Sequence, residues 1–290
     1  MSMGIYFAIM SALCWAALDA QRKRLSQDLA ALAGVAYLSL GSAILFSCGL
    51  AFVPLEGLTS FAFWKATLAS AVLNLFANLL FFRAVQLSPL SLTVPYLSFT
   101  PVFLLLTGFL WLGEVPSWIA GAGAFVILLG AMLLNPGVGG GRFATLKALT
   151  KERGSLYMLI VAFLWSNSGP FDKMALQHGS IWLLSTAINL VIGVSVLFVM
   201  WYRGRLKELG GLKQCWPVCF TACVTMFIAS WTQLLAIEEI LVAYVDTIKR
   251  SGVIFVVLIG YFFFHERPLG PRLLGASVMV FGAVLVILGR

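Results

Sequence analysis

The chain has 290 residues, of which 61% are hydrophobic and only 10% are charged, and its formal net charge is +8. So little polar surface excludes a soluble globular protein of this size and leaves no room for a separate soluble domain. The basic residues lie between apolar segments, where they orient membrane helices, so the positive charge does not imply nucleic acid as a partner.

With about 20 apolar residues needed per span, the chain predicts an all-α membrane protein of ten transmembrane helices. No basic segment precedes the first apolar run, so we interpret it as an uncleaved first span. In chain order, the predicted helices cover residues 4–21, 31–53, 63–86, 92–112, 118–135, 155–175, 181–202, 215–237, 241–263 and 272–289.

The longest polar connection, residues 136–154, divides the chain into two halves, 1–135 and 155–290. An offset of 152 aligns Glu114 with Glu266, and an offset of 150 aligns Trp15 with Trp165. These matches predict two five-helix repeats. Because each repeat has an odd number of spans, the second is expected to enter the membrane inverted.

The distribution of lysine and arginine predicts the orientation in the membrane. One side of the predicted bundle carries nearly all of them, beginning with Arg22-Lys23-Arg24, and the other side has only Lys65, Lys173 and Arg290. Basic residues near helix ends stay in the cytoplasm. We therefore expect a multi-pass protein of the cell membrane, as in the inner membrane of a bacterium, with both termini on the non-cytoplasmic side.

The duplicated layout, the paired Trp15 and Trp165, and the matching corners Gly-Glu-Val-Pro (113–116) and His-Glu-Arg-Pro (265–268) resemble the drug/metabolite transporter superfamily. The likeness is greatest to its ten-helix, EamA-type branch. This resemblance implies that the first, fourth, sixth and ninth helices line a central cavity, which opens alternately to each side. Many members of that family have both termini in the cytoplasm, the reverse of what the charges predict here.

The ninth predicted helix carries the densest group of charges. Asp246 and Arg250 are four residues apart and can pair, which leaves Lys249 formally unneutralised. A spare positive charge would suit a carboxylate or a phosphate group, and the Lys-Arg pair also resembles the anion-binding pair of plastid phosphate translocators. Two alternatives are that the cations reach an interface or lock the helix to its neighbours, and that Asp246 carries a coupling proton.

Prolines predict where further ligand contacts lie. Pro95 and Pro101 disfavour a straight fourth helix, and the dipeptide 169–170, Gly-Pro, suggests a break in the sixth helix. Simple kinking for packing, or a place for the tryptophans at the membrane interface, is the alternative. The complete set of predicted substrate contacts is Lys249, Arg250, Asp246, Tyr244, Tyr96, Ser98, Trp15, Trp165 and Asn167.

Several other polar or small residues have structural interpretations. Asn74 and Asn78 predict interhelical hydrogen bonds, and Glu266, with its repeat mate Glu114, predicts a cap or hinge. Glycines at 123, 130, 275 and 282 predict close helix approach, within one chain or between the subunits of a dimer. Cysteines at 215, 219 and 223 form one helical stripe, for which packing is expected rather than a metal site.

The sequence predicts no enzyme, cofactor or metal site, because its two histidines lie near loop ends and no nucleophile–base spacing is present. We expect a secondary transporter of a small anionic or zwitterionic metabolite, such as an amino acid or organic acid, working by alternating access as a monomer or homodimer. A flippase for a lipid-linked sugar or phosphate, or a multidrug or amine exporter, is the alternative.

Overall fold

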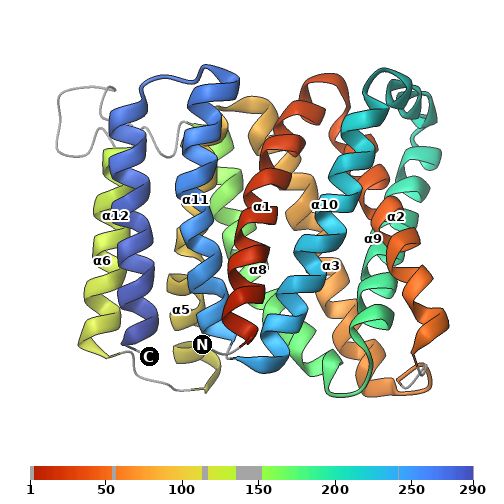
Figure 1. Ribbon diagram of the computed structural model, residues 1–290, viewed down its shortest axis with the longest axis horizontal. Coiled ribbons are helices and arrows are strands. Elements are labelled where there is room, and N and C mark those ends of the chain that lie inside the picture. Colours follow the sequence, from red (N-terminus) through yellow and green to blue (C-terminus); the bar gives the residue numbers. More distant parts are fainter. Residues whose placement is uncertain (1–2, 54–56, 113–116, 135–151, 241, 290) are drawn as a thin grey trace.

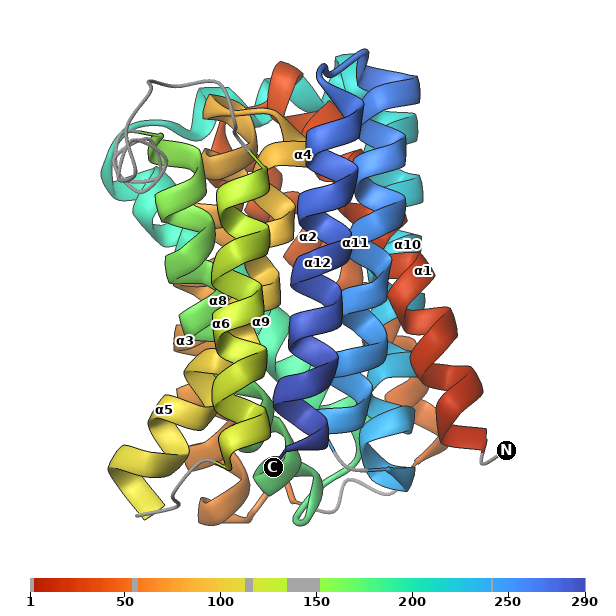
Figure 2. The same cartoon turned by 90° about the vertical axis from the view of Figure 1, so that its left-hand side faces the viewer.

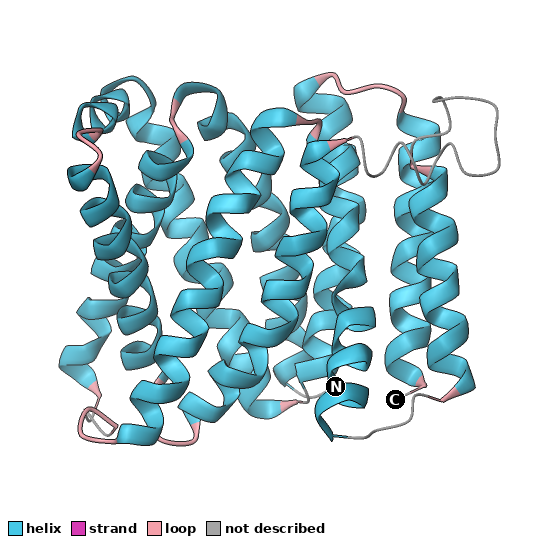
Figure 3. Cartoon of the chain, turned by 180° about the vertical axis from the view of Figure 1, so that it is seen from behind, coloured by secondary structure: helices cyan, strands magenta, loops and turns pink. Residues whose placement is uncertain are grey.

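The computed structural model describes residues 3–53, 57–112, 117–134, 152–240 and 242–289. The described part is built from helices joined by short turns and contains no β-strand (Figure 3). The predicted all-α fold class is therefore correct. Most of the predicted connection between the halves, 136–154, and the predicted corner at Glu114 lie outside the described residues.

The helices of the first half are α1 (Met3–Asp28), α2 (Ala31–Gly49), α3 (Phe61–Leu87), α4 (Leu90–Thr93), α5 (Thr100–Leu112) and α6 (Trp118–Leu133). Two 3-10 segments, η1 (Leu50–Phe52) and η2 (Val94–Phe99), complete it. The second half has α8 (Arg153–Leu176), α9 (Ile181–Tyr202), the 3-10 segment η3 (Leu206–Gly211), α10 (Leu212–Glu239), α11 (Val242–Phe264) and α12 (Leu269–Leu288).

Seven of the described helices are long and apolar enough to cross a bilayer. They are α1, α2 with η1, α3, α9, α10, α11 and α12, while Leu90–Leu106 and Trp118–Leu133 are shorter apolar helical stretches. The chain is thus a helical protein of the membrane, whereas the count of ten spans stays a prediction.

Both termini lie at one end of the bundle, which we call the terminal end (Figure 1). At this end Gly4 packs beside Glu239, and Gly289 packs beside Ser117. The opposite, or far, end is where α1 finishes at Asp28 and α4 begins at Leu90. These two names allow each site below to be placed along the bundle.

Helices of one half pack mainly on helices of the other (Figures 1 and 2). The most extensive pairs are α1 with α10, α3 with α8, α2 with α9, and α6 with α12. Replacing each helix by its counterpart in the other half turns the α1–α10 pair into the α8–α3 pair. The same exchange leaves the α2–α9 and α6–α12 pairs unchanged. This is the pattern that the predicted inverted repeat requires.

The glycines of α6 and α12 bring these two helices together within one chain. A Cβ atom added at Gly123 would lie 2.7 Å from the carbonyl oxygen of Gly282, and one at Gly130 would lie 2.8 Å from that of Gly275. The later glycine of α6, Gly130, meets the earlier glycine of α12, Gly275, so the two helices run antiparallel. The predicted close approach is therefore found inside the monomer.

The cysteine stripe of α10 packs against α2, as expected from its small side chains. Cys215 and Cys219 are buried. The Cys223 thiol lies 3.5 Å from the carbonyl oxygen of Tyr37, where it donates a weak hydrogen bond, and the Cys223 side chain fills the space above Gly41. These residues hold α2 in place beside the central helices.

Candidate functional site

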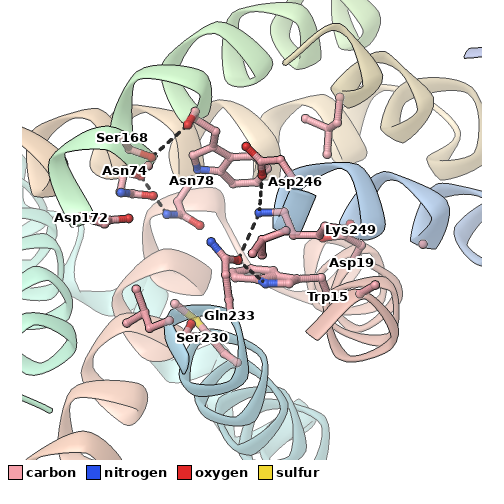
Figure 4. Close-up of a pocket in the computed structure, with 18 of the residues that line it drawn as sticks. Trp15, Asp19, Asn74, Asn78, Ser168, Asp172, Ser230, Gln233, Asp246 and Lys249 are labelled. Carbon is pink, nitrogen blue, oxygen red and sulfur yellow. Dashed lines mark hydrogen bonds and ion pairs between the residues drawn. The ribbon is translucent and has the colours of Figure 1, made fainter. Parts of the chain in front are cut away.

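A cavity of about 140 Å³ lies between the two halves of the bundle (Figure 4). Side chains from α1, α3, η2, α8, α9, α10 and α11 line it. The family resemblance implied that the first, fourth, sixth and ninth helices would do so, and α1, η2, α8 and α11 are their counterparts. Toward the terminal end the lining reaches the first turns of α9 and α11, at Leu184 and Val245. On α1 and in η2 the lining reaches Arg22 and Val94, nearer the far end, so the cavity is central in the bundle.

Helix α11 contributes the three charged residues that the sequence singled out. The Asp246 carboxylate lies 3.5 Å from Lys249 Nζ and 3.7 Å from an Arg250 guanidinium nitrogen, so it pairs with both. Lys249 also donates a hydrogen bond of 3.1 Å to Gln233 Oε1 on α10. The predicted pairing of Asp246 with Arg250 is confirmed. The predicted formal excess of one positive charge on α11 is present, because one carboxylate faces both cations.

Helix α1 contributes a second ion pair, of which one member, Arg22, had been placed in a loop by the sequence-based prediction. The predicted helix ended at residue 21, but α1 continues to Asp28. Arg22 is therefore inside the bundle, with only 1% of its surface exposed, and it lies 3.6 Å from Asp19. Its Nη2 donates to Asn78 Oδ1 at 2.9 Å, while its Nε makes no hydrogen bond among the described residues. An Arg22 donor thus remains available beside the cavity.

The charges around the cavity are formally balanced. Three carboxylates and three cations line it, and they come from α1, α8 and α11. They are Asp19, Asp172 and Asp246, and Arg22, Lys249 and Arg250. Because the formal sum is zero, the site offers both signs of charge to a ligand and no excess of either.

A row of polar side chains on α3 joins the α1 cation to the α8 carboxylate. We call Ser70, Asn74 and Asn78 the α3 polar row. Asn78 accepts from Arg22, and its side-chain amide donates to the backbone carbonyl of Asn74 at 2.8 Å. The Asn74 amide donates to Ser70 Oγ at 3.1 Å, and the Ser70 hydroxyl donates to Asp172 Oδ1 at 2.5 Å. The α3 polar row therefore has a cation, Arg22, at one end and a carboxylate, Asp172, at the other.

Two tryptophans form the aromatic part of the wall. The ring centroids of Trp15 and Trp165 are 6.4 Å apart. Trp15 Nε1 donates to Gln233 Oε1 at 2.8 Å, and the Arg22 and Lys249 cations lie 5.5 Å and 5.6 Å from the Trp15 ring. Trp15 is thus fixed by a hydrogen bond and two cation–π contacts, with aromatic surface available for an apolar part of a ligand.

Tyr96 and Ser98, predicted as contacts, are buried but do not line this cavity. The proline-rich segment forms the 3-10 segment η2, with three residues per turn. Val94 and Leu97 therefore share the face that lines the cavity, while Tyr96 stacks on Phe99 on another face. The predicted break in the fourth helix is confirmed. The residues that line the cavity there are Val94 and Leu97, in place of the predicted Tyr96 and Ser98.

Tyr244 and Asn167 are also absent from the lining. On α11 the lining recurs with helical spacing at 245, 249, 252 and 256, which leaves Tyr244 half exposed on another side. The Asn167 amide donates back to the Phe163 carbonyl at 2.8 Å, within α8. Helix α8 continues through Pro170, so the predicted break there is not seen.

Three polar residues at the centre of the site escaped the sequence-based prediction, namely Asp19, Asp172 and Gln233. Each lies inside a predicted span. Ionisable residues within spans are candidates for function by default, and that rule would have identified both aspartates. Gln233 carries no charge, so only the structure reveals that it bridges Trp15 and Lys249.

The far end of the bundle is closed by a polar cluster between the halves. Glu266 accepts hydrogen bonds from the backbone N–H groups of Leu90 and Ser91, at 2.7 Å and 2.8 Å. Arg272 donates to the Ser91 hydroxyl at 2.6 Å and lies 3.7 Å from Glu266. Lys23, close by, donates to backbone carbonyls at the end of α3. The predicted capping role of Glu266 is confirmed.

Comparisons with known proteins agree with this architecture. The family model of the EamA-like transporters matches residues 2–135 and 152–288. One solved crystal structure is 16% identical and superposes with a TM-score of 0.63 over 100% of this chain and 98% of its own. At that identity the likeness concerns the fold alone. No curated protein matches the sequence.

Proposed function

The chain belongs to the EamA-like transporter family, and from that premise we propose that it carries a small zwitterionic metabolite, such as an amino acid, by alternating access through the central cavity. Membrane transport of a small molecule follows from the family. The substrate class and the mechanism are our proposal.

The balanced set of charges around the cavity carries this proposal. A buried charge without a partner is costly, so a net anionic ligand would leave the site with an uncompensated charge. A zwitterion adds one charge of each sign and keeps the sum at zero. Its carboxylate can meet the guanidinium of Arg22 or the ammonium of Lys249, and its amine can meet Asp19, all of which line the cavity.

The size of the cavity supports a small substrate. Its volume of about 140 Å³ is close to that of an engineered cavity of about 150 Å³ that holds one benzene molecule. An amino acid side chain packed beside the Trp15–Trp165 pair fits this scale. A lipid-linked sugar, the substrate of the alternative flippase, does not.

Alternating access is supported by the arrangement of the two halves. The packing of α6 on α12 is antiparallel and symmetric, because the Gly123–Gly282 contact becomes the Gly130–Gly275 contact when the halves are exchanged. Two bundles related in this way can rock about a central site. The Glu266 cluster closes the far end, as expected of one of two access states.

Ligand binding tests the substrate class directly, since a ligand of the folded state raises its melting temperature. The melting temperature of purified protein is measured with each L-amino acid. It is also measured with two analogues of each, a carboxylic acid without the amino group and an amine without the carboxyl group. We expect stabilisation by amino acids and not by their singly charged analogues. Stabilisation by phosphates or dicarboxylates alone would overturn the zwitterion, and stabilisation by lipid phosphates would favour the flippase.

Uptake into liposomes tests the site. Lys249→Ala is expected to abolish amino acid uptake while its yield of folded protein stays near that of the unmodified chain. Lys65→Ala is the matched control, because Lys65 is exposed and lies outside the cavity. If Lys249→Ala transports as well as Lys65→Ala, the assigned site is wrong.

A further inference from the structure

Asp172 differs from the other carboxylates of the cavity in having no cation beside it. Asp19 lies 3.6 Å from Arg22, and Asp246 lies within 3.7 Å of both Lys249 and Arg250. None of the ion pairs found in the described residues includes Asp172. Its hydrogen bond is a neutral one, from the Ser70 hydroxyl at 2.5 Å.

The other groups around Asp172 do not supply the missing charge at close range. The charged side chains that interact with it electrostatically are Lys249 and Asp246, both on α11 and opposite in sign. The neighbouring helices α3, α9 and α10 present only uncharged polar side chains to the same cavity. They are Asn74 and Asn78, Ser185 and Asn189, and Ser230 and Gln233.

An ionised carboxylate in this position is expensive, because the apolar surroundings solvate it poorly and a neutral hydroxyl compensates little. Taking up one proton removes the charge and leaves a carboxylic acid that can still hydrogen-bond to Ser70. Asp19 and Asp246 differ in that their protonation would leave arginine or lysine partners unpaired. Asp172 is therefore the cavity carboxylate best placed to change its charge during a transport cycle.

We propose that Asp172 binds and releases the proton that drives transport, an inference that rests on the proposed function. Hydronium on one side of the membrane gives its proton to the carboxylate, and water on the other side receives it. With Asp172 neutral, the formal charge of the cavity changes from zero to +1, which favours a substrate carboxylate. The proton and the substrate then strengthen each other's binding, because such coupling is reciprocal.

The α3 polar row gives this charge change a route to the substrate site. When Asp172 loses its charge, the Ser70 hydroxyl loses its anionic acceptor, and the Ser70 and Asn74 side chains can adjust. The row continues to Asn78 and Arg22 through the backbone carbonyl of Asn74. The offset that aligns Trp15 with Trp165 also aligns Arg22 with Asp172. The predicted repeat therefore places a permanent cation in one half and the protonatable group in the other.

The test uses full-length protein in vesicles of phosphatidylethanolamine and phosphatidylglycerol that contain a fluorescent pH indicator. An equimolar mixture of the standard L-amino acids is added outside, and internal acidification is followed together with exchange of labelled for unlabelled amino acids. Unmodified protein should acidify the vesicle interior and should also exchange labelled for unlabelled amino acids. Asp172→Asn should lose the acidification and keep the exchange, and Asp172→Glu should restore the acidification.

Acidification by Asp172→Asn at the unmodified rate would overturn the proposal, as would uptake driven by a sodium gradient in place of protons. Unmodified protein that exchanges amino acids without acidification would refute the coupling alone. If it neither exchanges nor is stabilised by amino acids, the proposed function fails instead.

A second measurement needs no variant at Asp172. Dicyclohexylcarbodiimide reacts with protonated carboxyl groups in apolar surroundings, so peptide mass mapping of the treated protein should place the adduct on Asp172. The amino acid mixture should change the extent of this labelling. An adduct on Asp19 or Asp246, with Asp172 unmodified, would contradict the inference even if Asp172→Asn cannot be purified in folded form.

Discussion

The Glu266 carboxylate accepts hydrogen bonds from both the backbone N–H and the hydroxyl of Ser91, at 2.8 Å and 2.5 Å, although the two residues are 175 positions apart. This contact joins the start of α4 to the corner between α11 and α12. At the terminal end, the residues equivalent to Ser91 and Arg272 are alanines, Ala243 and Ala120, at the offset of 152. Among the described residues, the Glu266 cluster thus uses two polar side chains, Ser91 and Arg272, that the equivalent positions do not supply.

Glu266→Ala should weaken this closure. It removes the acceptor of two backbone N–H groups and one hydroxyl, and hydrogen bonds to charged groups contribute about 1.5–3 kcal/mol each. We expect a lower melting temperature. We also expect faster labelling of a cysteine introduced at Leu97 by an impermeant maleimide added from the far end, in a background without the five native cysteines.

Glu238→Ala is the control for this experiment, because Glu238 is an exposed glutamate near the end of α10. It should change neither the melting temperature nor the labelling. Equal labelling of the introduced cysteine in Glu266→Ala and Glu238→Ala would mean that the Glu266 cluster does not close the far end.

Gly123→Ala should destabilise the protein. The added methyl group would lie 2.6 Å from the backbone nitrogen of Val286, and backbone atoms cannot move aside as a flexible side chain can. Overpacking of this kind costs about 1–3 kcal/mol. Gly121→Ala, two residues away on α6, meets nothing within 4 Å and should be neutral or slightly stabilising. Thermal unfolding of both variants compares them, and equal melting temperatures would show that α6 and α12 are not in close contact.

The Asp19–Arg22 pair should show strong energetic coupling. Removing one partner of a buried pair leaves an uncompensated charge and costs about 3–5 kcal/mol, so Asp19→Asn and Arg22→Gln should each be strongly destabilising. The double variant should recover much of this loss. Reversible unfolding in mixed micelles measures all three free energies of unfolding.

The exposed pair Arg24 and Asp28, 3.7 Å apart on the same helix, provides the control cycle. Exposed pairs contribute about 0–1 kcal/mol, so Arg24→Gln and Asp28→Asn should have small effects. If the two cycles give the same coupling energy, Arg22 is not in the buried environment described here.

The sequence was informative where residue type alone carries the signal. Charges within a span are rare enough to identify Asp246, Lys249 and Arg250, and glycine spacing predicted a close helix approach, which the structure places between α6 and α12. Arg22 was misplaced because hydropathy finds the apolar middle of a helix but not its end. Tyr96 and Ser98 were misplaced because prolines predict a break without saying that a 3-10 turn replaces the α-helix and changes which residues share a face.

The orientation in the membrane is the last feature that the charges predict. Both termini are expected on the non-cytoplasmic side, because the far end carries the basic residues, including Arg203, Arg205 and Lys207. In a bacterial host, alkaline phosphatase fused after Gly289 should therefore be active and a green fluorescent protein fused there should be dark. Fusions after Gly204, at the far end, should give the opposite result.

This orientation decides which side the cavity faces. With the termini outside, the Glu266 cluster closes the cytoplasmic end, so the path past this cluster into the cavity is blocked from the cytoplasm. Protons and substrate would then reach Asp172 and Lys249 from outside, as uptake requires. A fluorescent fusion after Gly289 together with active phosphatase after Gly204 would place both termini in the cytoplasm. The same geometry would then describe a cavity loaded from the cytoplasm, and export would become the direction to test.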